Sequence, residues 1–437
     1  MHNHCNADTG PGGKGKIQVL VFPCGAENAI EIHRALRYSI HVDLHGASSV
    51  DDHGTYRFDS YCGDLPNIQH PEFETAFAAL ISRLNIDVVF ATHDSVMEYL
   101  ATRSERLGVA LINGDPDTAS TARRKSRTYR TFSDCAWSPR IFDDIAHVTS
   151  WPVVIKPDAG QGGQGVVVAP DADHARLALA STADPIIMEY LPGEEVSVDC
   201  FTDRHRKVIW TCARTRERVR AGIAMRSRIL KPDSDIEAIA RHINSRLRLR
   251  GPWFFQLKRD LRGDWKLLEI SCRIAGTMVA QRAHGINLPL MAIQDYLERD
   301  LVCLPNRQVD MVDRCISTRA RMSSPFDTVF VDLDDTLIIN GYPTPLVMAF
   351  LYQCLSEGKT IKLITRHAYD VSDTLRAARI SESLFSEIIH IRDGDVKSRY
   401  LTPGSLFIDN HFPERLDASR NSLATPVDVD SLEFFIK

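Results

Sequence analysis

Residues 153–169 read VVIKPDAGQGGQGVVVA, a cluster of glycines between two apolar runs. It predicts an apolar strand that ends at Lys156, a glycine-rich loop and a second strand. Because a strand follows the glycines, the loop differs from a dinucleotide-binding fingerprint, which opens a helix. It also lacks the Gly-Lys-Ser/Thr of a Walker loop. A purely structural turn is one interpretation; the other is a hairpin whose backbone N–H groups cover phosphates, with Lys156 as a cation.

Three later segments contain the other groups that a nucleotide site needs. Residues 186–188 form an apolar strand, and the acidic segment that follows, up to Glu195, resembles a hinge. Gln256 lies on a further predicted strand. Glu269, Ser271 and Arg273 alternate along another strand and therefore share one of its faces. A carboxylate can hold Mg²⁺, and an arginine can neutralise a transferred phosphoryl group. These segments favour a phosphate-binding function for the glycine loop.

Taken together, residues 16–310 resemble the ATP-grasp superfamily with its preceding α/β domain, and most of all its carbamoyl-phosphate-synthase-like carboxylate–amine ligases. The resemblance implies ATP and Mg²⁺ as cofactors, with Mn²⁺ as an alternative metal. It also implies a role for each matching residue. Lys125, Lys156, Gly162 and Gly163 would contact the ATP phosphates, Glu189 and Leu191 the adenine, and Glu195 the ribose; Gln256, Glu269 and Ser271 would hold metal, and Arg273 would stabilise the transition state.

Four positions leave alternatives open. Many relatives have asparagine where this chain has Ser271, so weakened metal binding or a pseudoenzyme is compatible with the sequence. Lys125 lies among arginines and could belong to a solvated helix face. Arg216 and Arg220 belong to a basic run over residues 214–231, and we predict that they clamp an acidic substrate through paired guanidinium contacts. A solvated basic surface is the alternative for either arginine.

A second phosphate chemistry is indicated by residues 329–337, which read VFVDLDDTL. An apolar strand ends at Asp332, and Asp334 follows two positions later. Both carboxylates would then project beyond the carboxyl edge of a sheet, where one can attack phosphorus and the other can transfer a proton.

Residues 326–437 resemble the haloacid-dehalogenase (HAD) superfamily of phosphatases, whose four motifs occur in order. The resemblance implies Asp332 as the nucleophile, Asp334 as general acid/base and Thr365 as a ligand of the substrate phosphate. It implies Lys397 as a neutralising cation, and Asp332, the backbone carbonyl of Asp334 and Asp409 as ligands of Mg²⁺. The intervals between these motifs are too short for a sizeable cap domain.

The composition is that of a globular protein, with 44% hydrophobic and 25% charged residues. A net charge of −5 gives no reason to expect nucleic acid or membrane as a partner. Ten scattered cysteines favour reduced thiols and a cytoplasmic location. We predict an α/β and α+β multidomain fold. It comprises a disordered tail (1–15), a doubly wound α/β domain (16–113), an ATP-grasp domain (114–310) that opens with one helix over 115–129 capped by Asp117, a linker (311–325), and a Rossmannoid HAD-like domain (326–437).

The sequence thus predicts a bifunctional enzyme that joins a small-molecule carboxylate to an amine and hydrolyses a phosphorylated small molecule. Two alternatives remain: an ATP-grasp kinase that releases a phosphorylated product, and a nucleotide-binding regulatory module in which only the phosphatase works. A homodimer is compatible with the sequence.

Overall fold

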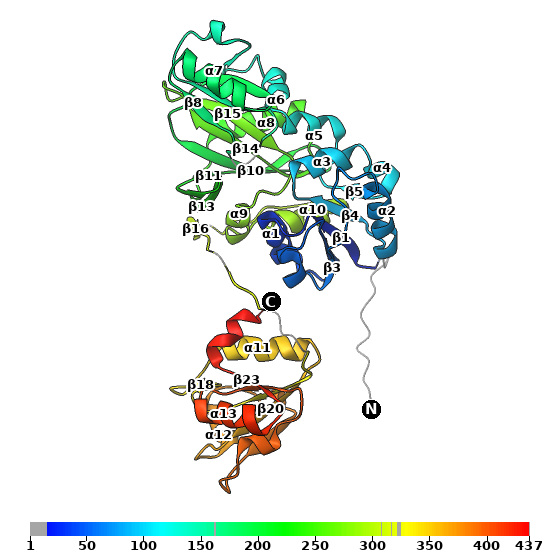
Figure 1. The fold of residues 1–437 in the computed structure, drawn as a ribbon, viewed down its shortest axis with the longest axis vertical. Coiled ribbons are helices and arrows are strands. Elements are labelled where there is room, and N and C mark those ends of the chain that lie inside the picture. The colour runs from blue at the N-terminus through cyan, green and yellow to red at the C-terminus, as the bar shows by residue number, and fades with distance from the viewer. Residues whose placement is uncertain (1–14, 161–162, 307, 316, 321–324, 437) are drawn as a thin grey trace. The chain divides into compact units, whose positions relative to one another are not determined.

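The computed structural model describes residues 15–160, 163–306, 308–315, 317–320 and 325–436 (Figure 1). The chain divides into two compact units, residues 1–315 and 316–437, and each is described by itself. Most of the predicted disordered tail, and Gly162 of the predicted phosphate-covering hairpin (the flap, residues 160–165), lie outside the described residues.

The first unit begins with a parallel five-stranded sheet in the order β3-β2-β1-β4-β5. Its strands are β1 (Ile17–Phe22), β2 (Val42–Ala47), β3 (Ser60–Cys62), β4 (Val88–Ala91) and β5 (Ala110–Leu111), joined by helices α1 (Glu27–Leu36), α2 (Phe73–Leu84), α3 (Asp94–Ala101) and α4 (Ser104–Leu107). The central strands are almost wholly buried, as expected where helices cover both faces. The strand order reverses between β1 and β4, and this is the position at which doubly wound sheets bind ligands.

The predicted single helix over 115–129 is wrong. The structure has α5 (Pro116–Arg123) and α6 (Lys125–Thr131), separated by extended backbone at Arg124. Asp115, not Asp117, caps α5 by accepting the Thr118 N–H at 2.9 Å, because Pro116 occupies the first helical position. The break places Lys125 at the start of its own helix.

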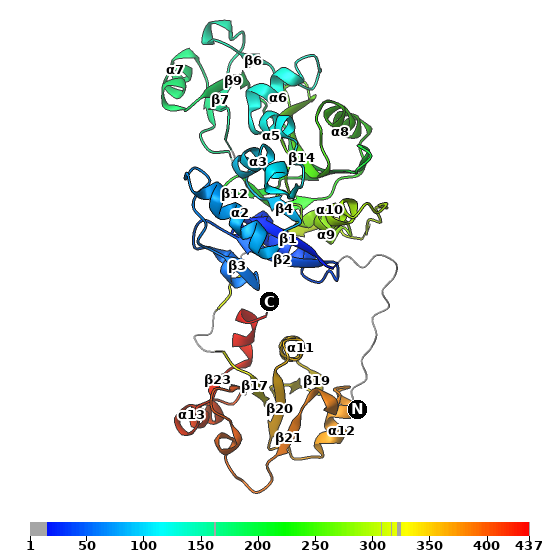
Figure 2. The same ribbon diagram turned by 90° about the vertical axis from the view of Figure 1, so that its right-hand side faces the viewer.

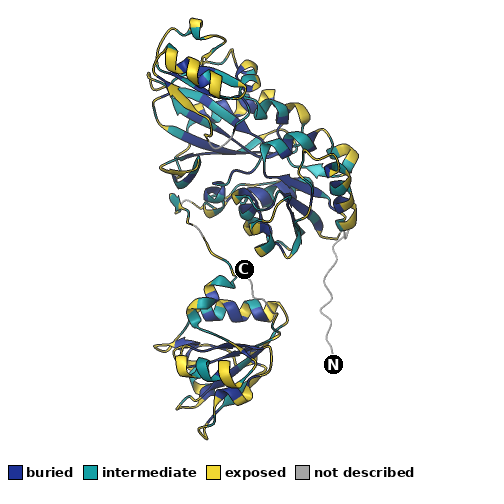
Figure 3. Ribbon diagram, in the orientation of Figure 1, coloured by how far each residue is buried: buried dark blue, intermediate teal, exposed yellow. Residues whose placement is uncertain are grey.

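Two larger antiparallel sheets follow in the first unit. One has the order β6-β9-β7-β8, with β6 (Ile141–Phe142), β7 (Val153–Pro157), β8 (Val167–Ala169) and β9 (Pro185–Glu189), and it packs against α7 (Ala172–Ser181). The other has the order β11-β10-β14-β15, with β10 (Glu195–Thr202), β11 (Val208–Thr215), β14 (Gly251–Arg259) and β15 (Trp265–Ser271). Helix α8 (Ser234–Arg246) packs on the second sheet through the core around Trp253 and Phe255 (Figure 3).

A third sheet, β12-β13-β16, joins β12 (Arg218–Arg220) and β13 (Ile223–Arg228) to β16 (Met311–Asp313). β16 lies within the predicted linker, which therefore begins too early: Ser227 pairs with Val312 and Arg228 with Met311. Helix α10 (Leu288–Tyr296) packs into the core of the first sheet through Leu288, Ala292 and Ile293, and the short helix α9 (Val279–Ala283) precedes it. Within the described residues, no helix combines the length and the apolar character needed to cross a membrane.

The second unit is a parallel five-stranded sheet in the order β21-β20-β17-β22-β23 (Figure 2). The strands are β17 (Thr328–Val331), β20 (Thr360–Thr365), β21 (Glu387–His390), β22 (Leu406–Ile408) and β23 (Thr425–Val427). Helices α11 (Pro345–Ser356), α12 (Val371–Ala377) and α13 (Phe412–Asn421) connect them, and β18 (Ile338–Ile339) and β19 (Tyr342–Pro343) form a small hairpin. Within residues 325–436 no further cap domain is inserted between these elements.

Candidate functional sites

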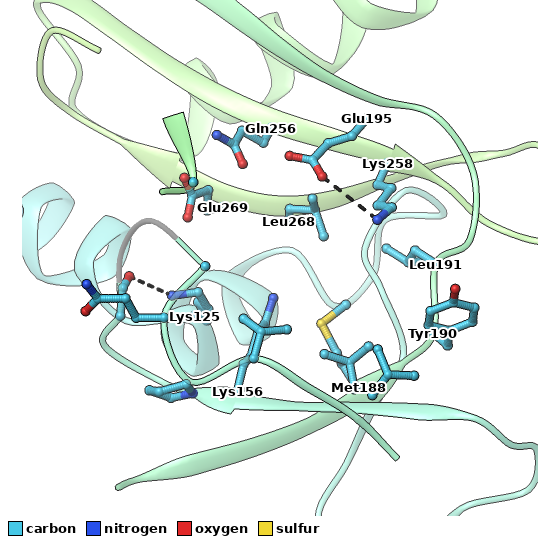
Figure 4. A pocket seen from close by; sticks show the side chains of 18 of the residues that line it. Lys125, Lys156, Met188, Tyr190, Leu191, Glu195, Gln256, Lys258, Leu268 and Glu269 are labelled. Carbon is cyan, nitrogen blue, oxygen red and sulfur yellow. Dashed lines mark hydrogen bonds and ion pairs between the residues drawn. The ribbon is translucent and has the colours of Figure 1, made fainter. Parts of the chain in front are cut away.

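A cavity of about 390 Å³ lies between the two antiparallel sheets of the first unit, as Figure 4 shows. Side chains reach it from both sides, including Lys156 on β7 and Glu269 on β15. It contains most of the residues that the sequence assigned to a nucleotide: Lys125, Lys156, Gly163, Glu189, Leu191, Glu195, Gln256 and Glu269. Ser271, Arg273 and Arg220 are not among its lining residues.

One end of the cavity is apolar. Met188, Tyr190 and Leu191 lie on and after β9, opposite Leu268 of β15 (Figure 4). A flat apolar slot between two sheets suits the faces of an adenine ring. The Glu189 carboxylate accepts the backbone N–H of Arg140 at 2.8 Å, which fixes the start of this hinge.

The other end carries two lysines. Asp158 follows β7 and caps α6 by accepting the Ser126 N–H at 2.6 Å, so that Lys125 lies beside the glycine loop. The Lys125 Nζ donates to the Gly160 carbonyl at 3.0 Å. Gly163 and Gly165 have φ near +70°, which L-residues with side chains adopt only with strain. The hairpin can therefore turn back tightly over the lysines.

Lys156 is almost fully buried, and its Nζ lies 2.9 Å from the Tyr129 hydroxyl. Burial, together with the neighbouring Lys125, lowers the pKa of Lys156 to about 7. A lysine without a carboxylate of its own at hydrogen-bonding distance is suited to an anionic ligand, whose charge stabilises the ammonium form.

This pKa predicts that binding of Mg-ATP takes up a proton above pH 7. The free protein is then increasingly neutral at Lys156, whereas the bound phosphates favour its charged form. Affinity should therefore fall by up to about tenfold per pH unit above 7 and level off below it. Calorimetry at pH 8 in two buffers of different ionisation enthalpy measures the uptake directly. Lys156→Met should bind more weakly and lose this proton uptake; an uptake that persists in Lys156→Met contradicts the assignment.

Gln256 and Glu269 face each other on the paired strands β14 and β15. An amide oxygen and a carboxylate are donors that Mg²⁺ accepts, and the ion usually completes its shell with phosphates and water. The described residues contain no cluster of three or more His, Cys, Asp or Glu that would hold a metal unaided. These two side chains therefore fit an ion that enters together with the nucleotide.

The structure places Ser271 and Arg273 differently from the prediction. Both contact Asp94, the first residue of α3 at the carboxyl end of β4: Ser271 Oγ donates to Oδ1 at 2.7 Å and Arg273 Nη2 to Oδ2 at 2.8 Å. The Ser271 hydroxyl is thus directed to a carboxylate of the first sheet rather than into the cavity with Glu269. Sequence reasoning missed Asp94, although its position after a strand beside the strand-order reversal is a usable signal.

The two arginines of the predicted acid clamp lie in different places. Arg216 lines the cavity, where it pairs with Glu195 at 2.7 Å and donates to the Gly222 carbonyl at 2.8 Å. Arg220 is exposed on the β12–β13 hairpin, away from the cavity lining. Arg218 and Arg226 of the same basic run pair with Asp313. Tertiary ion pairs therefore neutralise much of what the sequence shows as a positive surface.

The second unit brings its predicted residues to one edge of the sheet. Asp332, Thr365 and Asp409 lie at the carboxyl ends of β17, β20 and β22, which are neighbours. Lys397 Nζ donates to Asp332 Oδ1 at 2.6 Å and to Asp409 Oδ2 at 2.7 Å. All four side chains are buried. This is the strand-order reversal of the sheet, where doubly wound folds bind ligands.

Burial and neighbouring charges act in opposite directions on the pKa values of this cluster. Burial raises the pKa of Asp332 to about 6, although Lys397 opposes the shift. Burial also disfavours the Lys397 ammonium, but Asp332 and Asp409 outweigh it and raise the pKa of Lys397. Two buried carboxylates that face one cation fit an additional divalent ion. The Asp334 carboxylate does not join them, because it faces the His367 Nδ1 at 2.8 Å; Asp334 could reach such an ion only through its backbone carbonyl.

Comparisons with known proteins agree on the class of the first unit. Residues 181–316 match the family model described as ATP-grasp in the biosynthetic pathway with Ter operon. Similar solved structures include an L-amino acid ligase from Bacillus licheniformis (18% identity, TM-score 0.53, covering 66% of this chain and 75% of that one). N5-carboxyaminoimidazole synthetase from Staphylococcus aureus with ADP is similar at 11% identity and TM-score 0.55, covering 66% and 79%. At such identities the likeness shows the fold alone, and together with the family match it is the ATP-grasp fold.

The curated relatives share one enzyme name, but they match a shorter part of the chain than the solved structures do. Phosphoribosylamine–glycine ligase of Mesorhizobium japonicum is 33% identical over 103 residues, which cover 22% of this chain and 23% of the relative. The enzyme of the same name from Caulobacter vibrioides is 26% identical over 167 residues, covering 33% and 38%. The chain thus matches well under half the length of these relatives.

Proposed function

We propose that the first unit is an ATP-dependent ligase that joins a carboxylate to an amine. The observation that carries this proposal is the cavity in which two lysines, an apolar slot and the Gln256–Glu269 pair converge. The names of relatives support it: the curated relatives are phosphoribosylamine–glycine ligases, and an L-amino acid ligase has a similar fold.

The residues suit two successive steps. A substrate carboxylate oxygen attacks the γ-phosphorus of ATP, and the bond between that phosphorus and the β–γ bridging oxygen breaks. ADP is released and an acyl phosphate is formed. The amine nitrogen then attacks the acyl carbon, inorganic phosphate leaves, and the nitrogen loses a proton. Lys125 and Lys156 bind the phosphates, and the flap excludes water that would hydrolyse the acyl phosphate. A bound Mg²⁺ would neutralise phosphate charge at Gln256 and Glu269.

The experiment is ADP release across a panel of carboxylates, each with and without amines, followed by mass measurement of the product. The ligase requires both substrates for a stable amide product. A product that retains phosphate would instead show a kinase, and nucleotide binding without ADP release would show a regulatory module.

Asp94 gives this proposal a sharper test. We predict that Asp94→Ala lowers the kcat of ADP formation by roughly 10- to 150-fold, because Arg273 loses a charge-assisted hydrogen bond worth about 1.5–3 kcal/mol. The Kd of ATP should change little, since Asp94 does not line the cavity. Glu98→Ala on the same helix is the matched control. A parallel loss of ATP affinity would show that Asp94 supports the fold rather than the reacting groups.

We propose further that the second unit is a phosphatase, so that the chain is bifunctional. Its support is the buried Asp332–Lys397–Asp409 cluster with Thr365 at the strand-order reversal. The Asp332 carboxylate attacks phosphorus, the ester P–O bond breaks, and the departing oxygen takes a proton from Asp334 to give the alcohol. Water then attacks the aspartyl-phosphate, gives a proton to Asp334 and releases inorganic phosphate. Lys397 forms ion pairs with both carboxylates in the resting site; a bound Mg²⁺ would stabilise phosphate charge beside Asp332 and Asp409.

A further inference from the structure

We propose that the site of the second unit takes a small phosphomonoester whose alcohol carries a flat aromatic ring, which stacks on Tyr369. This inference rests on the proposed phosphatase and names the class of its substrate.

The position of the leaving alcohol follows from the chemistry of the site. Asp334 must touch the ester oxygen in order to protonate it, so the alcohol attached to that oxygen lies beside Asp334. The His367 Nδ1 is 2.8 Å from Asp334, and the His367 ring makes an edge contact with Tyr369 at a centroid separation of 5.5 Å. Thr374 holds the other ring nitrogen of His367 at 2.7 Å. Tyr369 is therefore placed one side chain away from the leaving group.

Tyr369 is 75% exposed, although it carries a large apolar surface. Tyr342 and Phe412 are similarly exposed, at 76% and 64%. In the sequence the three come after β17, β20 and β22 respectively: Tyr342 is on β19, Tyr369 follows β20 and Phe412 begins α13. Because single exposed aromatic residues are ordinary, the inference rests on Tyr369, whose ring contacts His367 beside Asp334.

The surrounding charges favour a small ligand over a polynucleotide. Arg366, the arginine nearest to Tyr369 in sequence, pairs with Glu414 at 3.1 Å and donates to the Asp395 carbonyl at 2.9 Å. Binding a polyphosphate backbone requires a track of cations that face the ligand. Here the Arg366 guanidinium binds other protein groups, whereas the ring of Tyr369 is exposed to a ligand. Stacking on such a ring face accepts any flat ring.

Two esters separate stacking from general hydrophobicity: 2-phenylethyl phosphate and 2-cyclohexylethyl phosphate. Their leaving alcohols have nearly the same acidity, but only the first has a flat ring. The full-length protein should hydrolyse the phenyl compound with a kcat/KM about tenfold higher. In Tyr369→Ala that ratio should fall towards one, whereas Tyr369→Phe should keep it. Tyr352→Ala, an exposed tyrosine on α11, is the matched control and should leave both values unchanged.

Binding provides a second readout that does not need turnover. The Asp332→Asn protein should bind the phenyl ester more tightly than the cyclohexyl ester by calorimetry, and adding Tyr369→Ala should remove the difference. Equal kcat/KM values for the two esters, or a ratio unaffected by Tyr369→Ala, would overturn the ring inference while leaving the phosphatase intact. Failure to hydrolyse either ester or p-nitrophenyl phosphate would overturn the phosphatase itself.

Discussion

Replacing Asp332 by asparagine is expected to reduce hydrolysis of phosphate monoesters by about 10³-fold or more, because the nucleophile is lost while its shape is kept. Asparagine can still accept a hydrogen bond from Lys397, which lies 2.6 Å from the native carboxylate, so the buried site should remain folded. ATP-dependent ADP release should be unchanged, since it belongs to the other unit. The measurement is p-nitrophenol release, with ADP release from the same preparation as an internal reference.

Asp335, three positions after Asp332, provides the control. Asp335 is exposed and has φ near +54°, a conformation that asparagine tolerates well. Asp335→Asn should therefore retain hydrolysis within about a factor of two, as most surface changes do. Comparable losses in both variants would mean that the loop, rather than the Asp332 nucleophile, was being tested. Full activity in Asp332→Asn would refute the aspartyl-phosphate mechanism.

The second large effect concerns Glu269. Glu269→Gln should lower ADP formation by roughly 10²-fold or more, because it removes the charged member of the Gln256–Glu269 pair that fits Mg²⁺. The Mg²⁺ concentration needed for half-maximal turnover should rise as well. Titration of ADP release against Mg²⁺ measures both changes.

A matched comparison separates this effect from loss of the fold. Phosphate-ester hydrolysis should be unaffected in Glu269→Gln, and the thermal midpoint of the first unit should fall by only a few degrees. Ser271→Ala should be milder than Glu269→Gln, because the Ser271 hydroxyl is bonded to Asp94 rather than directed into the cavity. If Ser271→Ala raised the Mg²⁺ requirement as strongly as Glu269→Gln, the serine would be a metal ligand after all.

Many residues of the two candidate sites could be predicted from local sequence patterns. Lys156, the glycines at 163 and 165 and Glu269 are each marked by a strand, a turn or an alternation that neighbouring residues impose. The same holds for Asp332, Thr365 and Asp409, because each ends an apolar strand, and parallel strands bring their carboxyl ends to one edge. Such features depend on periodicity and burial over a few residues.

Pairings between distant residues could not be read in this way. The Asp94 carboxylate meets Ser271 and Arg273 across 177 and 179 positions of sequence. The pairing of Arg216 with Glu195 likewise depends on how β10 and β11 are aligned in register. A single sequence shows which charges exist, but not which opposite charge the packing will bring to each of them.

Local periodicity and turn chemistry predicted most of the strands and the residues that end them, including those of the two proposed phosphate sites. The packing of distant segments set the partners of the polar side chains: Ser271 donates to Asp94, Arg226 of β13 pairs with Asp313, and Asp334 faces His367. The attraction between two opposite charges is strong only when they lie within a few ångströms of each other, and which group comes that close is set by the packing of whole sheets and helices.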